Sequence, residues 1–413
     1  MNGLAPDEAA AYLAILHALR CTCKFYDTHV HPYEVLFDRF SYGDEGVFRD
    51  LRCLTGRGYV APAVAGFKFP ESAEVDEGAR SQRFKDIWVM LLRKVYGSVG
   101  ERVFVDHMNL SGIDKVLMLP VPLESCSAQS FDDRMRWVSQ LYGNEQRFWI
   151  AGSIPAALAD RDVAPYAQAL VRRYGIRAMK CHPVISGIDL GSSSRKQWLE
   201  ALLVACRELK LPLVLHGGRN SPYWEGNRGD FGSLEHLKEV DLSLSGSPVV
   251  LAHAGCHRCT PQQIELEELP LLNRLLKKHA NLHVDISGLA YQPLKLVLQS
   301  VDHDRILFGS DALYVQQYEA VTMTMHALKE LGHNVEAAFV KIASTNPERT
   351  IFVDGESHAD LDEDKVESVP GAGEGKVPVA SLPQSGIFLR AAEQDSCAGV
   401  LGFVGTEAGE QEG

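Results

Sequence analysis

The sequence predicts a (β/α)8 TIM barrel, an α/β fold in which eight parallel strands close on themselves inside a ring of helices. Three observations favour this fold. Short apolar segments recur eight times along the chain, helical patterns separate most of them, and several segments end in histidine or aspartate. An open, doubly wound sheet is the alternative, but it gives no reason for polar residues at so many segment ends.

The predicted strands are apolar runs rather than strict alternations, as expected of parallel strands that are buried on both faces. In chain order the segments read KFYDTHVH, GIDKVLMLPV, RFWIAGSIP, GIRAMKCHPV, LPLVLHGG, SPVVLAHAG, NLHVDISG and RILFGSDA. From the fourth onward they start near residues 175, 211, 247, 281 and 305. Helical stretches such as SRKQWLEALLVACRELK and IELEELPLLNRLLKKHA, with apolar residues three and four apart, lie between them.

The predicted barrel spans residues 23–352 and carries three additions. Residues 1–22 have acids where a signal peptide needs positive charge, so we expect a short amphipathic helix. Residues 32–111 separate the first strand from the second, and such a long insertion is expected to form a lid over the barrel mouth. Residues 353–413 are acidic and rich in Gly, Pro and Ser, which predicts a disordered tail.

Composition narrows the function classes. Of the net charge of −13, residues 353–413 contribute thirteen acids against three bases, or −10, which leaves −3 for the rest. Nothing resembles a basic face for nucleic acid, and no apolar run approaches the ~18–20 residues of a membrane span. We therefore expect a small-molecule substrate, with neither nucleic acid nor membrane as a partner.

The nine cysteines are odd in number and scattered, which indicates reduced thiols in a cytoplasmic protein rather than a disulfide framework. Cys256 and Cys259 form a lone C-x-x-C. A structural zinc site would need a second pair at suitable spacing, and none is evident.

Polar residues mark the ends of five predicted strands, and in a barrel these ends meet at one mouth. They are His29 and His31 on the first strand, Lys180 and His182 on the fourth, His216 on the fifth, His253 on the sixth and Asp311 on the eighth. His29 and His31 are two apart, so in a strand both point to the same face and can hold one ion. A lysine inside an apolar strand is rarely buried without a partner.

Taken singly, each residue has a plainer explanation. A histidine at a strand end is more often a hydrogen-bonded structural residue, and an aspartate after Gly-Ser is more often a turn or helix cap. Five strand ends together predict a metal site. Histidine and carboxylate ligands without thiolate suit Zn²⁺, and less decisively Mn²⁺ or Fe²⁺. With one position open, a bound water would supply hydroxide near neutral pH.

The motif set resembles the amidohydrolase superfamily. The resemblance lies in D-x-H-x-H on strand one, the strand-four lysine, the histidines of strands five and six, and GSD on strand eight. It is greatest to the amidohydrolase-related branch, which includes aminocarboxymuconate-semialdehyde decarboxylase-type metal-dependent hydrolases. The segment NPERTIF at 346–352 also resembles the closing helix of that branch.

The resemblance implies a role for each matching residue. His29, His31, His216 and Asp311 would be the metal ligands, with Asp311 also the proton shuttle and His253 the catalytic group that polarises the substrate. Lys180 has two implied states, because in binuclear members it is carbamylated and bridges two metals and in mononuclear members it does not bridge. Asp27 is expected to orient a ligand histidine. His182 gains no family role. Related proteins often dimerise, so the resemblance makes a homodimer a possible assembly.

Three hypotheses follow for the function. The first is a hydrolase that cleaves a C–N or C–O bond of a small amide, lactone or ester through a metal-bound hydroxide. The second is a non-oxidative decarboxylase of a small carboxylic acid, which a cationic clamp from Arg39 or Arg228 would favour. The third is a barrel that binds a ligand without turnover. An intact ligand set weighs against the third, because a lost metal would leave buried polar groups unpaired.

Overall fold

The computed structural model describes residues 3–32, 63–70, 101–143, 145–218, 230–312 and 315–353. The chain divides into two units, residues 1–370 and 371–413, and every described residue lies in the first. Most of the predicted lid and the tail beyond Val353 therefore fall outside the described residues, as do Arg39 and Arg228.

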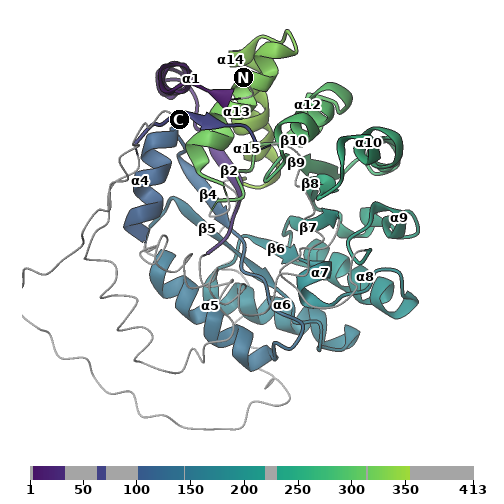
Figure 1. Ribbon diagram of the computed structural model, residues 1–413. Coiled ribbons are helices and arrows are strands. Elements are labelled where there is room, and N and C mark those ends of the chain that lie inside the picture. Colours follow the sequence, from purple (N-terminus) through teal and green to yellow (C-terminus); the bar gives the residue numbers. More distant parts are fainter. Residues whose placement is uncertain are drawn as a thin grey trace, which may run out of the picture. The chain divides into compact units, whose positions relative to one another are not determined.

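Eight parallel strands form the centre of the first unit, paired in the order β2, β4, β5, β6, β7, β8, β9 and β10 (Figure 1). Their bounds are β2 Tyr26–Val30, β4 Lys115–Met118, β5 Phe148–Ser153, β6 Ala178–Cys181, β7 Leu213–Gly218, β8 Val249–His257, β9 Leu282–Asp285 and β10 Ile306–Leu307. Seven of the eight predicted segments contain one of these strands, and the sixth contains all of β8 except its last two residues.

Hydrogen bonds between the first and last strands bring the sheet round on itself. Thr28 N donates to Phe308 O at 3.0 Å, and His31 N donates to Ala312 O at 2.8 Å. Val30 pairs with Ala312 in the same parallel sense. The predicted TIM barrel is thereby confirmed.

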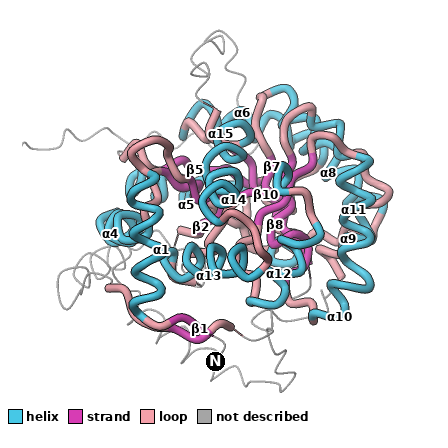
Figure 2. Tube along the Cα trace, turned by 90° about the horizontal axis from the view of Figure 1, so that it is seen from above, coloured by secondary structure: helices cyan, strands magenta, loops and turns pink. Residues whose placement is uncertain are grey.

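Helices surround the strands on all sides (Figures 1 and 2). The longer ones are α4 Glu101–Ser111, α5 Ala128–Tyr142, α6 Asp160–Tyr174, α8 Ser193–Glu208, α11 Leu269–Lys278, α12 Tyr291–Ser300 and α13 Gln317–Glu330. The shorter ones are α7 Pro183–Ser186, α9 Leu234–Leu237, α10 Pro261–Gln263, α14 Val335–Val340 and α15 Asn346–Thr350. The 3-10 turns are Leu242–Ser245 and His303–Arg305, and the π-helical turns are Ile264–Glu268 and Lys341–Thr345.

Local chemistry explains where these helices begin and end. The Ser192 hydroxyl accepts a hydrogen bond from Arg195 N at 3.3 Å and caps α8. Gly175 adopts a left-handed φ of 58° and ends α6. The predicted helix over 264–280 is divided, because Pro270 has no N–H to donate and the preceding turn is π-helical.

A two-stranded sheet joins the N-terminus to the described part of the predicted lid. β1 Gly3–Leu4 pairs antiparallel with β3 Phe67–Lys68, and α1 Pro6–Leu19 follows β1 within the region predicted to be helical. Phe69 stacks on Tyr291 of α12 with ring centroids 4.0 Å apart. Residues 63–70 thus pack against the outer helices, and a lid over the mouth remains a prediction for residues outside the described ranges.

The lower part of the barrel interior is filled by apolar side chains. Phe352 follows α15 and stacks on Tyr26, with ring centroids 4.6 Å apart. Its ring centroid lies 5.0 Å from that of Trp149. The cluster comprises Tyr26, Leu117, Leu119, Ala151, Ala178, Val214, Val250, Ala252, Leu307, Ile351 and Phe352. Such layers of branched and aromatic side chains make the barrel a packed core rather than a pore.

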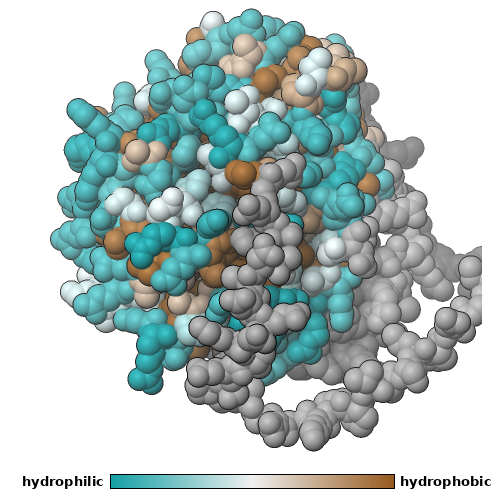
Figure 3. Space-filling model, turned by 180° about the vertical axis from the view of Figure 1, so that it is seen from behind, coloured by the Kyte–Doolittle hydropathy of each residue, from teal (hydrophilic) through white to brown (hydrophobic). Residues whose placement is uncertain are grey.

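The described surface is mainly hydrophilic on the face seen in Figure 3. Within the described ranges, Leu266 and Val353 are the large hydrophobic side chains that are exposed. None of the helices described there combines the length and the apolar character that crossing a membrane requires.

Candidate metal centre

Three side chains bring potential ligand atoms together at the carboxyl ends of the strands. His29 Nε2 lies 3.2 Å from His31 Nε2. Asp311 Oδ1 lies 3.4 Å from His31 Nε2 and 3.8 Å from His29 Nε2. All three residues are buried, and in the described part of the chain they are the one group of this kind that could hold an ion. The structure therefore gathers three of the four predicted ligands, and His216 is not part of the group.

Hydrogen bonds at the outer ring nitrogens assign the protons of the two histidines. His29 Nδ1 lies 2.9 Å from Asp285 Oδ2, and His31 Nδ1 lies 2.9 Å from Leu119 O. A carboxylate and a carbonyl only accept, so both Nδ1 atoms carry the hydrogen. Burial, with Lys180 as the next cause, lowers the pKa of His29 to about 3, so its ring is neutral. The His29 Nε2 is then a lone pair, and it faces the Nε2 of His31.

Asp311 adds a third acceptor to the same point. Its Oδ1 is buried and has no hydrogen-bond partner among the described residues. The donor nearby is Lys180, whose Nζ lies 3.5 Å from His29 Nε2, longer than a good hydrogen bond. Converging buried acceptors are costly unless a cation sits among them. The donor set therefore fits a metal ion.

The charges in contact with His29 support the same conclusion. Asp27 accepts from the His29 backbone N, Asp285 binds the ring and Asp311 faces it, while Lys180 places a cation against it. These four buried groups sum to a formal charge of −2. A divalent cation would balance that charge, whereas uncompensated buried charge is unfavourable. Two imidazoles and a carboxylate without thiolate suit Zn²⁺, Mn²⁺ or Fe²⁺.

Asp285 is a site residue that the sequence reasoning missed. It is fully buried at the end of β9, where its Oδ2 holds the His29 ring and its Oδ1 accepts from His253 N at 3.0 Å. Although burial raises it, the neighbouring His29 keeps the pKa of Asp285 below its usual range. A carboxylate behind a metal-ligand histidine fixes its tautomer and its orientation. The signal was present, since Asp285 ends the seventh strand as other site residues end theirs.

Asp27, in contrast, does not hold the ring of a ligand histidine. It accepts from the His29 backbone N at 3.1 Å, from Ser310 N at 2.9 Å and from Gln317 Nε2 at 2.8 Å. Burial raises its pKa to about 6, against the hydrogen bonds from Ser310 and Gln317 that lower it. Asp27 thereby ties the first strand to the segment that carries Asp311.

His253 and His216 form a second pair of imidazoles with assigned protons. His253 Nδ1 lies 2.8 Å from Ser287 O, so it donates there and leaves Nε2 as the acceptor. That Nε2 lies 3.1 Å from His216 Nδ1, which must then donate. Burial lowers the pKa of both rings. His216 Nε2 is left as a lone pair, the form that binds a metal or accepts a proton.

Lys180 is buried inside the barrel, two residues beyond Ala178 on the same face of β6. Burial lowers its pKa to about 8, against the raising effect of Asp285 and Asp311. At neutral pH the larger fraction stays cationic, so the side chain supplies a positive charge beside the ligand set.

Two further histidines extend the wall of imidazoles. His182 stacks on His216 with ring centroids 3.7 Å apart and planes at 14°. His257, absent from the sequence-based set, lies with its ring 4.8 Å from that of His253 and 5.1 Å from that of His216. The sixth strand was expected to end at His253, whereas β8 continues to His257.

Backbone strain concentrates at the same place. His253 and Asp311 have φ values of 55° and 61°, in the left-handed region that costs a non-glycine residue roughly 1–2 kcal/mol. Gly288 also has a positive φ, 59°, and a Cβ there would lie 2.5 Å from Asp311 Oδ2. Strain of this kind persists where the surroundings over-determine it, as at functional sites.

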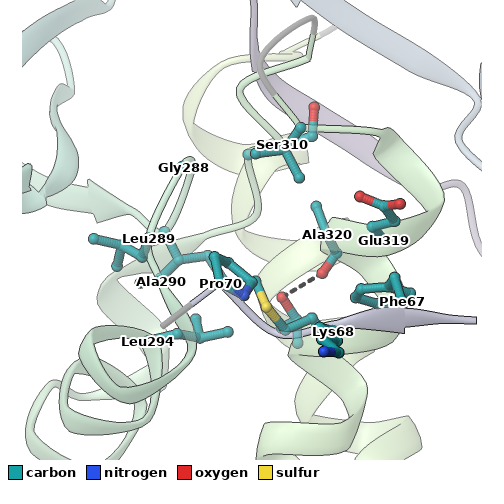
Figure 4. Close-up of a pocket in the computed structure, with 15 residues that line it drawn as sticks. Phe67, Lys68, Pro70, Gly288, Leu289, Ala290, Leu294, Ser310, Glu319 and Ala320 are labelled. Atoms are coloured by element: carbon teal, nitrogen blue, oxygen red, sulfur yellow. Dashed lines mark hydrogen bonds between the residues drawn. The ribbon is translucent and has the colours of Figure 1, made fainter. Parts of the chain in front are cut away.

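A separate cavity of about 310 Å³ lies between residues 67–70, α12 and α13 (Figure 4). Its wall includes Gly288, Gly309 and Ser310, but none of the three potential metal ligands. The cavity therefore lies behind the ligand set.

The C-x-x-C pair follows His253 on the chain and does not form a disulfide. No disulfide joins any two of the described cysteines, Cys256 and Cys259 included. Both are buried, and burial raises the pKa of the Cys256 thiol. Buried thiols of this kind are unreactive.

Comparison with known families gives one match. The model of the family described as Amidohydrolase matches residues 132–353, more than half of the chain. A search of curated proteins returns no match.

Solved structures match the chain at low sequence identity. The 2,6-dihydroxybenzoate decarboxylase from Rhizobium is 14% identical, with 81% of this chain and 100% of that chain covered and a TM-score of 0.48. A putative amidohydrolase from Staphylococcus aureus is 16% identical, with coverages of 60% and 90% and a TM-score of 0.44. The 5-carboxyvanillate decarboxylase from Sphingomonas paucimobilis is 12% identical, with coverages of 80% and 99% and a TM-score of 0.46. These similarities bear on neither substrate nor reaction.

Proposed function

Because the chain belongs to the amidohydrolase family, we propose that it is a metal-dependent hydrolase that cleaves a C–N or C–O bond of a small amide, lactone or ester. His29, His31 and Asp311 would hold the ion, with His216 as a fourth ligand through its Nε2. The chemistry that Zn²⁺, Mn²⁺ or Fe²⁺ supplies when bound is polarisation of the substrate carbonyl and a lowered pKa of water.

One observation carries this proposal. The Nε2 atoms of His29 and His31 and the Oδ1 of Asp311 converge on one buried point, where each offers a ligand atom. Without a cation between them, acceptor atoms at this spacing would repel one another. Three or four protein ligands with a position left open for water or substrate are typical of catalytic rather than structural metal centres.

Asp311 is the proposed proton carrier. Water adds to the carbonyl carbon and its proton passes to the Asp311 carboxylate. When the C–N or C–O bond breaks, the same proton goes to the leaving nitrogen or oxygen. The left-handed backbone of Asp311 and the absence of a Cβ at Gly288 hold the carboxyl where both transfers can occur.

His253 is the proposed group for polarising the substrate carbonyl. In the structure its Nε2 accepts from His216, so the substrate must displace that contact and Nε2 must carry a proton for this role. Ser287 O and the His253 backbone bond to Asp285 keep the ring in place meanwhile.

A decarboxylase is the second candidate, and buried Lys180 is the observation that favours it. Its ammonium beside the ligand set could hold a substrate carboxylate. The C–C bond to that carboxylate would break, CO₂ would leave and the carbon would take a proton from Asp311 or His253. A free, uncarbamylated lysine is required, which links this candidate to a mononuclear site.

Metal content of the purified protein is the first test. We expect near one Zn²⁺ or Mn²⁺ per chain by elemental analysis, lost in a His29→Ala/His31→Ala double variant. The matched control is His303→Ala/His333→Ala, a histidine pair with rings 4.7 Å apart on other elements, which should keep the ion. Close to two ions would point to a carbamylated Lys180, and no ion under any loading condition would overturn the proposal.

The metal-loaded protein is then assayed on two panels. Small amides, lactones and esters are followed by product formation, and small carboxylic acids by CO₂ release. Turnover on the first panel only supports hydrolysis, and turnover on the second only replaces it with decarboxylation. A fully loaded protein inactive on both would leave the barrel as a binding protein.

A further inference from the structure

The ladder between β7 and β8 contains a large bulge at the site. His216 pairs with Ala252, and the next pair is Gly218 with His257. One residue of β7, number 217, therefore stands opposite four residues of β8, numbers 253–256. Bulges of this sort re-aim side chains and are frequent beside active sites.

Three consecutive residues of the bulge are left-handed. His253, Ala254 and Gly255 have φ values of 55°, 51° and 71°. Two of the three are not glycine, so the conformation is held against its intrinsic cost. The turn directs the His253 ring toward His216. After the turn the chain rejoins the ladder, where His257 pairs with Gly218.

Gly218 makes room for this return. A Cβ at residue 218 would lie 2.5 Å from both the Cβ and the backbone N of His257. The two strands thus approach more closely than any other residue type would permit. Two features, a strained bulge and a glycine contact, place the His257 ring beside His253 and His216.

The His257 side chain contacts its neighbours through ring packing. Its ring is in contact with the rings of His216 and His253, but no hydrogen bond to either ring nitrogen occurs within the described residues. His253, by comparison, is hydrogen-bonded at both nitrogens. Residue 257 is intermediate between buried and exposed, so a ligand at the mouth can reach it.

We propose that His257 is a substrate-contacting residue, whose imidazole hydrogen-bonds an oxygen or nitrogen substituent next to the bond that reacts. It would thereby set which small molecules are accepted, and its loss would weaken binding more than turnover. This inference rests on the proposed metal-dependent function, because the contact is made to a substrate held at that centre.

The test uses acetohydroxamate, a small chelating analogue of an amide, and the Zn²⁺-loaded full chain. Calorimetry compares the parent with His257→Phe, which keeps the ring and removes hydrogen bonding, and His257→Asn, which keeps a donor. His333→Phe, the same exchange at an exposed position outside the site, is the control. We expect His257→Phe to weaken binding about five- to tenfold, with part of the loss recovered in His257→Asn.

Kinetics with the best substrate of the panels give the second readout. His257→Phe should raise KM about five- to tenfold with kcat within about twofold, and metal content should stay at the parent value. Parent-like binding by His257→Phe, no binding of acetohydroxamate by the parent, or loss of metal from the variant would each overturn the role. A protein without turnover in which the variants still differ in acetohydroxamate affinity overturns the proposed reaction and keeps the His257 contact.

Discussion

The two ends of the barrel are built from the same strands and differ in almost every other respect. Ala178 and Lys180 lie on one face of β6, and Val214 and His216 lie on one face of β7. In each strand the first residue belongs to the apolar cluster under Phe352, and the second lies in the polar wall at the carboxyl ends. A step of two residues along a strand therefore changes the barrel interior from apolar packing to polar side chains of the candidate site.

The difference teaches which interactions depend on exact geometry. In the apolar end any combination of side chains that fills the volume stabilises the fold, because the hydrophobic effect is not directional. In the polar end each buried atom needs its own partner, and the ladder bulge and left-handed residues are the local cost of supplying it. Substitutions at the two ends should therefore separate stability from function.

The largest effect is expected from Asp311→Asn. It removes one ligand and the proposed proton carrier while keeping the shape, so kcat/KM should fall by about a thousandfold or more and metal content should drop. The metal-free variant should be more stable than the metal-free parent by about 1 kcal/mol, because the amide can donate to the Nε2 lone pair of His29. Steady-state kinetics, elemental analysis and urea unfolding measure the three quantities.

Asp304→Asn is the matched control, since Asp304 is a carboxylate that pairs with Lys341 away from the site. It should leave metal content and kcat/KM at the parent values. An Asp311→Asn protein that keeps its metal and its activity would contradict the assignment of Asp311.

Phe352→Ala, at the apolar end, should lower stability and leave metal content and turnover nearly unchanged. Phe352 is 1% exposed and contacts Tyr26 and Trp149, so a cavity would remain and unfolding free energy should fall by about 3–5 kcal/mol. Metal per folded chain and kcat should stay within about twofold of the parent. If activity per folded molecule fell in proportion to stability, the two ends would not be separable.

Gly288→Ala tests the backbone that supports the polar end. Its Cβ would press on Asp311 Oδ2 at 2.5 Å, and the φ of 59° would strain any alanine there. We expect metal affinity to fall about 10- to 100-fold with a modest loss of stability. Gly332→Ala is the control, because that glycine also has a positive φ, 77°, yet a Cβ meets nothing within 4 Å. Equal metal loss in both would show that strain alone is responsible.

The fold could be predicted from sequence because its signal is repeated. Eight apolar segments with helices between them recur at nearly regular spacing, and each overlaps an observed strand. His29 and His31 could be predicted from a spacing of two, since a strand puts both on one face. Lys180 and Asp311 could be predicted from polar residues in or just after apolar runs.

Other features depend on long-range geometry that no local pattern carries. Asp285 is buried against His29 from 256 positions away, so its role appears only once β9 and β2 are placed. The continuation of β8 to His257 needs a left-handed bulge, which residues 253–255 show no sign of beyond one glycine. Propensity describes single residues, whereas a bulge is stabilised by the neighbouring strand.

The smallest expected effect concerns pH at the apolar end, where His283 lies two residues before Asp285 on β9. Burial lowers the pKa of His283 to about 4, below the usual 6.5, so the unfolded chain binds the proton more readily. Its contribution to stability is therefore complete above about pH 6.5 and is lost as the pH falls toward 4. Comparing urea unfolding of the metal-free parent and His283→Gln at pH 7.5 and 5 should show the parent losing about 1–2 kcal/mol more than the variant. Equal losses would mean that the histidines of the polar end carry the whole pH dependence, and that the contrast between the two ends extends to proton uptake.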